Sequence, residues 1–225
     1  MNRYLAVGDI HGCRHAFEAL LESVRPTSDD IIIVLGDYVD RGPDSAGVID
    51  LLLDLDRSNS LVALRGNHEW MMLESRDSAI WRRSWLSHGG AETLASYGIE
   101  RADPDAFEKI PPAHLDFLSK GLQPYWESDS SIFVHAFVEP HKSLTKQSDA
   151  SLYWRRFVNP KPHMSRKKVI CGHTPQRNGV PGQSNGWVCI DTFAYDPSGW
   201  LSCLDVENEV VWQANEAGST RQFSL

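Results

Sequence analysis

Short apolar runs recur along the chain and predict a fold rich in β-strands. Between the early runs, apolar residues are spaced as on one face of a helix, in residues 15–24, 45–58, 69–98 and 104–120. The order of these elements predicts an α/β arrangement in the first part and a more meandering β region in the last. We expect mixed sheets with helices outside, in a single domain that spans residues 1–225. The predicted strands are residues 3–9, 30–37, 60–67, 131–136, 167–173, 186–191, 200–206 and 209–214.

Polar side chains follow five of these strands, at the point where each strand ends. Ligands bind beyond the carboxyl ends of the strands in open α/β sheets, so we expect these side chains to meet at one edge of the sheet. Turn formation would explain any one of them alone, but it does not explain five strand ends in a row. The residues are Asp9 and His11, Asp37 and Asp40, Asn67 and His68, His135, and His173.

The stretch LGDYVDRG crowds Asp37, Asp40 and Arg41 onto the end of a strand that is apolar enough to be buried. Carboxylates this close together cost free energy unless positive charge lies among them. The sequence therefore predicts metal ions and a phosphate group at this edge.

Five motifs carry a resemblance to a known family. They are GDIHG at residues 8–12, GDYVDRG at 36–42, RGNHE at 65–69, VHA around His135 and GHTP around His173. In order and rough spacing, they resemble the phosphoprotein phosphatase family within the calcineurin-like metallophosphoesterases, and in particular its short bacterial and phage serine/threonine phosphatases. The resemblance implies a β-sandwich of two mixed sheets flanked by helices, formed by a single metallophosphoesterase domain.

The resemblance also implies a centre of two divalent metal ions. Mixed nitrogen and oxygen ligands of this kind suit manganese, with iron, zinc or nickel as alternatives. Two ions roughly 3.5–4 Å apart can activate a bridging hydroxide for direct attack on a phosphoryl group. The ligands assigned by the resemblance are Asp9 and His11 for the first ion, Asp37 for both, and Asn67, His135 and His173 for the second.

A general acid is implied by the same motifs. Asp40 would orient His68, and His68 would protonate the departing alkoxide. The neighbouring carboxylate is expected to favour the imidazolium form that this role requires. We expect Glu69, which ends RGNHE, to support its loop rather than to take part in the chemistry.

Arginines of the motifs match phosphate-binding positions of the family. Arg41 and Arg65 are two of them, because a guanidinium can hold two phosphate oxygens at once. Simple ion pairs with neighbouring acidic residues are the alternative for both. Arg156 matches a further phosphate contact, and its neighbour Arg155 is the other candidate for that position.

The last histidine motif bears on the substrate. Pro175 in GHTP cannot bind a metal, which favours the phosphoprotein phosphatase branch over nucleases and phosphodiesterases. We therefore expect a metal-dependent phosphomonoesterase acting on phosphoserine or phosphothreonine proteins, with phosphotyrosine or small phosphoesters as further substrates. Hydrolysis of diadenosine tetraphosphate is the alternative, although those enzymes usually lack the aspartate that is Asp40 here. A non-catalytic scaffold would be expected to have lost ligands or His68, and all are present.

Several other residues have a structural interpretation. Phe137 after VHA and Phe193 in IDTF stand where the family commonly has glycine, and they would either narrow the pocket or pack on each other. Trp70, Trp81 and Trp85 would pack between helices or cap the site. The histidines outside the motifs are expected on the surface or in packing roles: His15, His88, His114, His141 and His163.

Composition and charge restrict the partners. The 225-residue chain is 41% apolar and has a net charge of −8, so a broad basic face for nucleic acid is not expected, whereas a locally positive pocket for a small phosphorylated substrate remains possible. We find no apolar run long enough to cross a bilayer and no signal peptide, and we therefore expect a cytoplasmic protein that binds no membrane. Free, mostly buried thiols are expected for Cys13, Cys171, Cys189 and Cys203.

Overall fold

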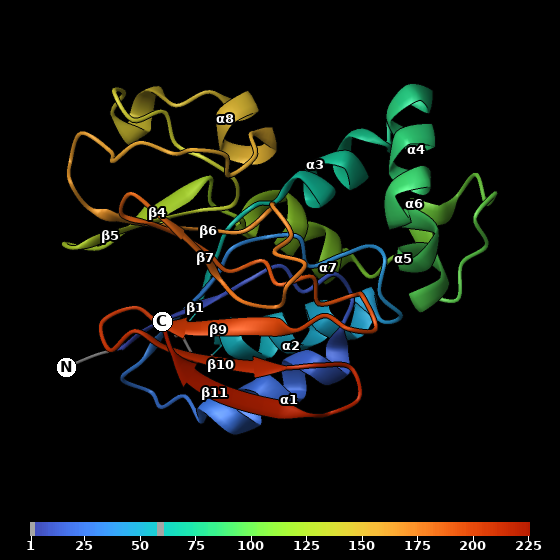
Figure 1. The fold of residues 1–225 in the computed structure, drawn as a ribbon. Coiled ribbons are helices and arrows are strands. Elements are labelled where there is room, and N and C mark those ends of the chain that lie inside the picture. Colours follow the sequence, from blue (N-terminus) through green and yellow to red (C-terminus); the bar gives the residue numbers. More distant parts are fainter. Residues whose placement is uncertain (1–2, 58–60) are drawn as a thin grey trace.

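The computed structural model describes residues 3–57 and 61–225. Two mixed β-sheets pack face to face, helices cover their outer faces, and the whole forms a single domain (Figure 1). This is the sandwich that the sequence predicts. Among the described residues, no helix has the length and apolar character needed to cross a membrane.

The first sheet has six strands in the order β11-β10-β9-β1-β2-β3. Its centre is parallel, because β1 pairs with β2 and β2 with β3 in the same direction. Beside β1, strands β9, β10 and β11 form an antiparallel meander. The strands are β1 (Tyr4–Val7), β2 (Ile31–Val34), β3 (Leu61–Ala63), β9 (Leu201–Asp205), β10 (Val210–Ala214) and β11 (Thr220–Ser224).

The second sheet has five strands in the order β4-β5-β6-β8-β7. Strands β5, β6 and β8 are parallel, and the two edge strands run antiparallel to their neighbours. The strands are β4 (Tyr125–Glu127), β5 (Ser131–Val134), β6 (Lys168–Cys171), β7 (Gly182–Ser184) and β8 (Trp187–Cys189).

Helices lie on both outer faces. In Figure 1, α1 and α2 lie against the first sheet, and α8 lies on the far side of the second. A chain of short helices, α3 to α7, connects β3 to β4 and rises beside the ends of the strands. The helices are α1 (Arg14–Val24), α2 (Ser45–Arg57), α3 (Asn67–Glu74), α4 (Ala79–Trp85), η1 (Leu86–Gly90), α5 (Ala91–Ser96), α6 (Ala106–Lys109), α7 (Pro112–Asp116), η2 (Phe117–Gly121), η3 (Leu144–Lys146) and α8 (Asp149–Trp154).

The central strands are apolar on both faces because both faces are covered. In β1, Leu5 and Val7 pack into the cluster that contains α1, whereas Ala6 packs between the two sheets. In β2, Ile33 likewise faces the inter-sheet cluster, while its neighbours Ile32 and Val34 face the helices. The continuous apolar runs of the sequence are thus buried strands.

All eight predicted strands are present, and three further ones, β4, β7 and β11, were not predicted. They lie at sheet edges and lack a long apolar run: YWE and GQS have three residues each, and TRQFS is mainly polar. The expectation that the five polar strand ends share one sheet is wrong. Strands β1, β2 and β3 belong to the first sheet, and β5 and β6 to the second. The polar ends still meet, because the parallel strands of both sheets end at the same end of the sandwich.

Candidate active site

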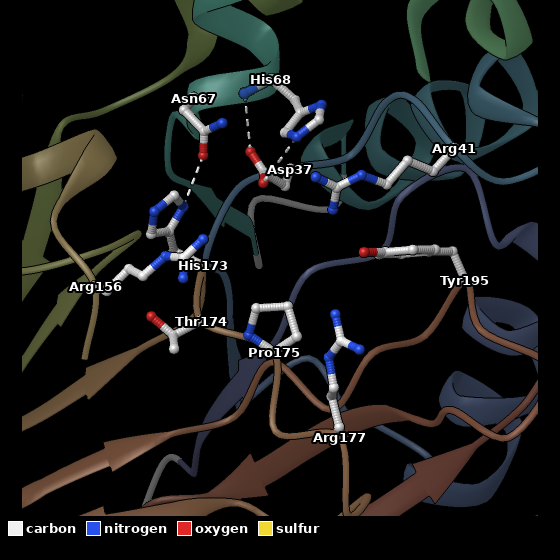
Figure 2. Close-up of a pocket in the computed structure, with 10 residues that line it drawn as sticks. All are labelled: Asp37, Arg41, Asn67, His68, Arg156, His173, Thr174, Pro175, Arg177 and Tyr195. Atoms are coloured by element: carbon white, nitrogen blue, oxygen red, sulfur yellow. Dashed lines mark hydrogen bonds and ion pairs between the residues drawn. The ribbon is translucent and has the colours of Figure 1, made fainter. Parts of the chain in front are cut away.

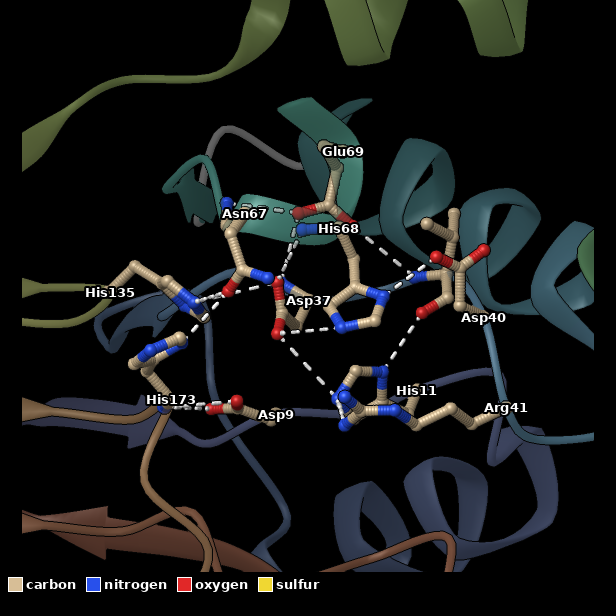
Figure 3. A network of polar contacts seen from close by, with 12 residues as sticks. Asp9, His11, Asp37, Asp40, Arg41, Asn67, His68, Glu69, His135 and His173 are labelled. Carbon is tan, nitrogen blue, oxygen red and sulfur yellow. Dashed lines mark hydrogen bonds and ion pairs between the residues drawn. The ribbon is translucent and has the colours of Figure 1, made fainter. Parts of the chain in front are cut away.

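Residues from both sheets converge around Asp37 (Figure 3). Its Oδ1 lies 3.5 Å from Nε2 of His135, and its Oδ2 lies 3.6 Å from Nε2 of His11 and 3.9 Å from Nε2 of His68. Two groups of ligand atoms therefore share this carboxylate, one with His11 and His68 and one with His135 and His173. Except for His173, which is half-buried, these side chains are buried.

The backbone around the site is strained. Five of the predicted site residues have a positive φ, between 49° and 75°, a backbone conformation that residues other than glycine rarely adopt. Such conformations persist only where the surroundings impose them. The five residues are His11, Asp37, Asp40, Arg41 and His173.

Glu69 is one of the groups that impose this conformation. Its buried carboxylate accepts hydrogen bonds from the backbone N–H groups of Asp37 (2.9 Å), Tyr38 (2.8 Å), Val39 (3.3 Å) and Gly66 (2.9 Å). Glu69 therefore ties the loop after β2 to the start of α3. The predicted loop-supporting role is confirmed. Gly66 allows the approach, because a Cβ there would lie 2.1 Å from Oδ1 of Asp37.

Three histidines are held in the tautomer that a metal ligand needs. One ring nitrogen of each lies at hydrogen-bond distance from a backbone carbonyl: Nδ1 of His11 from Val39 (2.9 Å), Nδ1 of His135 from Leu35 (2.9 Å), and Nε2 of His173 from Trp154 (3.1 Å). If that nitrogen carries the proton and donates it, the lone pair of the other nitrogen is directed into the site; that of His11 faces the guanidinium of Arg41. Backbone carbonyls commonly orient metal-binding imidazoles in this way.

The lone pairs of two histidines face another acceptor. Oδ1 of Asn67 lies 3.0 Å from Nε2 of His135 and 2.8 Å from Nδ1 of His173. Protonated rings would relieve the contact, but burial lowers the pKa of His135 to about 3 and that of His173 to about 4. A divalent cation between these acceptors would satisfy all of them, and N and O ligands of this kind fit one.

Asp9 supplies negative charge at the other side of the site. Both of its oxygens accept the backbone N–H of His173, at 3.0 and 3.1 Å. Burial raises the pKa of Asp9 well above its usual value, and the carboxylates of Asp191 and Asp37 raise it further. Asp191, in IDTF, was not singled out from the sequence; burial raises its pKa to about 7. A cation would offset this accumulation of buried carboxylates.

The residues present thus fit a metal centre. The oxygens of Asp9 belong to neither of the two groups of ligand atoms around Asp37. Asp9 still lies next to His173, because it accepts the backbone N–H of that residue. Which of these side chains bind which ion remains a prediction. The residues that would hold the ions are Asp9, His11, Asp37, Asn67, His135 and His173.

Asp40 and His68 form a buried pair. Nδ1 of His68 lies 2.7 Å from Oδ2 of Asp40, while Oδ1 of Asp40 accepts from the indole N–H of Trp85 (2.9 Å) and the hydroxyl of Thr93 (2.6 Å). Neither Trp85 nor Thr93 was predicted to take part, because both are far from the motifs in sequence. Burial lowers the pKa of His68 to about 4 and raises that of Asp40 well above its usual value. Burial thus opposes the imidazolium form expected from the sequence, but the raised pKa of Asp40 favours a proton on the pair.

An arginine-lined pocket opens beside this centre (Figure 2). It has a volume of about 300 Å³, and Arg41, Arg156 and Arg177 line it together with Asp37 and His68. Nη1 of Arg41 lies 2.7 Å from Nε2 of His11. Arg177 was not predicted, because it lies outside the motifs.

The other two candidate arginines are placed elsewhere. Arg155 stacks over the ring of Phe137 at 4.2 Å, so Arg156 is the member of the pair that lines the pocket. Nη2 of Arg65 donates to the carbonyl of Ser119 (3.0 Å), and Arg65 does not line the pocket. Its predicted phosphate contact stays a prediction.

The two phenylalanines in place of glycine have separate partners. Phe137 is buried and stacks on Trp187, with 4.6 Å between ring centroids. Phe193 packs edge-on against Tyr195 at 4.7 Å, and Arg177 lies over it at 5.1 Å. Phe193 therefore supports two residues that line the pocket.

The tryptophans fall mainly into packing roles. Trp70 pairs with Tyr153 and Trp81 with Trp154, while Trp85 is fully buried beside Phe107. The four cysteines are free and buried.

The site combines buried imidazoles, carboxylates and an amide oxygen at strand ends with three guanidinium groups beside them. This combination defines a metallophosphoesterase site, and hence a hydrolase. A family model described as calcineurin-like phosphoesterase matches residues 3–201. The chain therefore belongs to the calcineurin-like phosphoesterase family.

Similarity to individual proteins covers different shares of the chain. A bis(5'-nucleosyl)-tetraphosphatase PrpE [asymmetrical] from Anoxybacillus flavithermus is 37% identical over 84% of this chain and 84% of its own length. A symmetrical bis(5'-nucleosyl)-tetraphosphatase from Chromohalobacter salexigens is 30% identical over 84% of this chain and 65% of its own. Serine/threonine-protein phosphatase 1 from Salmonella typhimurium is 42% identical over 37% of each chain. The chain thus spans less than two thirds of the length of the last two.

Solved structures share the fold. A putative diadenosine tetraphosphatase superposes with a TM-score of 0.67 at 22% identity, covering 99% of this chain and 93% of that one. A cold-active protein tyrosine phosphatase gives the same TM-score at 14% identity, covering 99% of this chain and 78% of that one. At these identities the likeness concerns the fold alone.

Proposed function

We propose that this protein is a metal-dependent hydrolase of bis(5'-nucleosyl) tetraphosphates, such as diadenosine tetraphosphate. The observation that carries the proposal is the presence of Arg41, Arg156 and Arg177 in one pocket beside Asp37. Each guanidinium can hold two phosphate oxygens at once, so three of them can hold the oxygens of more than one phosphate group. The relatives that match 84% of the chain bear this activity in their names. The preference drawn from the sequence, for a protein phosphatase, is thereby reversed.

Each group of the pocket has a role in this proposal. Bound metal ions would polarise the phosphoryl group and lower the pKa of a water molecule. Arg41, Arg156 and Arg177 hold the phosphate chain and neutralise its charge. His68 gives the proton at Nε2 to the departing phosphate oxygen, and Asp40 holds the ring through Nδ1.

Dephosphorylation of phosphoserine or phosphothreonine is the second candidate. It is favoured by the intact pair of Asp40 and His68 and by the 42% identity to the Salmonella phosphatase over 88 residues. The aspartate of this pair was the sequence feature that separated the two activities.

A substrate comparison tests the proposal. The purified protein is assayed with Mn²⁺ on diadenosine tetraphosphate, on a phosphoserine peptide and on p-nitrophenyl phosphate, and nucleotide products are separated by chromatography. We expect kcat/KM for diadenosine tetraphosphate to exceed that for the peptide at least ten-fold, a difference of about 1.4 kcal/mol in transition-state stabilisation. The opposite order would favour the protein phosphatase. No turnover of any substrate with any divalent metal would contradict both.

A further inference from the structure

A second hollow adjoins the arginine-lined pocket. It has a volume of about 430 Å³, which lies in the range of about 300–1,000 Å³ found for small-molecule sites. Arg41 and Tyr195 line both cavities, so the two adjoin at this pair of side chains. The guanidinium of Arg41 lies over the ring of Tyr195 at 4.6 Å, as Figure 2 shows. The remaining walls come from η1 and the start of α5: Leu86, Ser87, His88, Gly89 and Glu92.

The chemistry of this hollow differs from that of the pocket. Arg41, at the shared wall, is the one arginine among the residues that line this hollow. The exposed carboxylate of Glu92 also lines it, and its negative charge disfavours a phosphate group there. No side-chain hydrogen bond or ion pair joins Glu92 to another residue in the described part of the chain. Leu86 and Tyr195 add apolar and aromatic surface. These groups suit a neutral ligand with hydroxyl or amine donors and an apolar ring face.

Polar atoms of η1 remain available to such a ligand. Nδ1 of His88 lies 2.7 Å from the carbonyl of Ser84; with the proton on Nδ1 it donates there, and Nε2 is left as an acceptor. The hydroxyl of Ser87 donates to the same carbonyl at 2.7 Å and keeps its acceptor lone pairs.

The turn itself is fixed against the active site. Gly89 has φ 113°, its carbonyl accepts the N–H of Arg41 at 3.3 Å, and a Cβ there would lie 2.4 Å from the nitrogen of Arg41. The η1 wall of the hollow is therefore anchored to the backbone of Arg41.

We infer that this hollow binds one nucleoside of the substrate. The inference rests on the proposed function and deepens it. A phosphate chain held by Arg41 on one side continues into a nucleoside on the other, where Glu92 accepts hydrogen bonds from its hydroxyl or amino groups. His88, interpreted from the sequence as a surface or packing residue, is then part of a binding surface.

Glu92→Gln tests the inference, with Glu100→Gln as the matched control. Glu100 is also exposed, lies just after α5 and lines neither cavity. The quantity measured is the ratio of kcat/KM for diadenosine tetraphosphate to that for p-nitrophenyl phosphate, which has no nucleoside. We expect the ratio to fall about five-fold in Glu92→Gln, because glutamine keeps an acceptor oxygen but loses the charge that strengthens the hydrogen bond, and to stay unchanged in Glu100→Gln.

Product inhibition gives a second measurement. ADP and inorganic pyrophosphate carry the same number of phosphates, so the difference in their inhibition of p-nitrophenyl phosphate hydrolysis reports the nucleoside. We expect ADP to inhibit the wild type more strongly than pyrophosphate does, and Glu92→Gln to narrow that difference.

The outcomes separate the inference from the proposed function. An unchanged ratio in Glu92→Gln, which includes an equal loss on both substrates, would overturn the nucleoside site while hydrolysis of diadenosine tetraphosphate by the wild type still stood. Hydrolysis of p-nitrophenyl phosphate without any hydrolysis of diadenosine tetraphosphate would overturn the proposed function and the inference together.

Discussion

Trp85 donates the N–H of its indole to Oδ1 of Asp40 across 2.9 Å, from a ring that has no exposed surface. The other oxygen of Asp40 faces His68 at 2.7 Å, so the indole helps to set the angle at which the carboxylate meets the imidazole. The only other side chain on Oδ1 in the described part of the chain is Thr93. Trp85 thus acts on His68 through Asp40, as a positioning residue.

Trp85→Phe should therefore lower turnover without removing metal. Phenylalanine keeps much of the buried apolar surface but has no donor, and Asp40 is left with Thr93 alone on Oδ1. We expect kcat on p-nitrophenyl phosphate to fall about ten-fold, with KM nearly unchanged. This corresponds to a loss of roughly 1–1.5 kcal/mol of transition-state stabilisation, because His68 is less well oriented. Steady-state kinetics and metal analysis of the same preparation measure both quantities. Trp81→Phe on the same helix is the control, and an equal loss in both variants would contradict the positioning role.

His68→Asn should abolish turnover while the metal content stays. Nε2 of His68 lies 3.9 Å from Oδ2 of Asp37, which places the ring in one of the two groups of possible metal ligands. If His68 is the general acid, as proposed, kcat should fall about 10²–10⁴-fold. Asn67→Ala is the comparison, since it removes an oxygen that faces two imidazoles, and it should lower metal content. Loss of metal in His68→Asn would identify His68 as a ligand instead.

The motifs predicted more of the site than the spacing of apolar residues alone. Periodicity located eight strands, because these are apolar runs, and it missed three edge strands that are short or mainly polar. Most predicted site residues meet around Asp37, because each one lies within a few residues of the carboxyl end of a strand with a parallel neighbour.

The remaining site residues come from parts of the chain without such an anchor. Trp85 and Arg177 lie in a helix and a loop whose positions depend on tertiary packing, so sequence spacing gives no indication of them. The placement of Arg155 and Arg156 shows the same limit, because adjacent residues in an extended stretch point to opposite sides and only the packing of Phe137 selects between them.

Arg156→Ala and Arg155→Ala should differ in their effect on substrate binding. Arg156 lines the pocket, whereas Arg155 lies over Phe137. Loss of one guanidinium contact to phosphate should raise KM for diadenosine tetraphosphate about ten-fold or more in Arg156→Ala. Arg155→Ala should leave KM within about two-fold and lower the melting temperature slightly through the lost stacking. If Arg155→Ala had the larger effect on KM, the placement of the two side chains would be wrong.

Asp30→Asn should destabilise the protein in a pH-dependent way. Asp30 is buried and accepts two hydrogen bonds from Arg3 (2.9 and 2.6 Å) and one from the N–H of Thr27 (2.7 Å). The hydrogen bond to the Arg3 guanidinium is the main cause that holds the pKa of Asp30 well below its usual value. A carboxylate with a lowered pKa stabilises the fold above the unfolded pKa of about 4, and this contribution is lost as the pH falls below it.

The expected loss in Asp30→Asn is about 2 kcal/mol of unfolding free energy at pH 7, measured by urea denaturation. It should shrink steadily when the same measurement is repeated between about pH 4 and pH 3, because Asp30 takes up a proton in the unfolded wild-type chain and this favours unfolding. Asp54→Asn, which removes the exposed pair with Arg57, should change stability little at any pH. A deficit in Asp30→Asn that stayed constant with pH would mean that packing or a neutral hydrogen bond, and not the charge of Asp30, stabilises this corner of the fold.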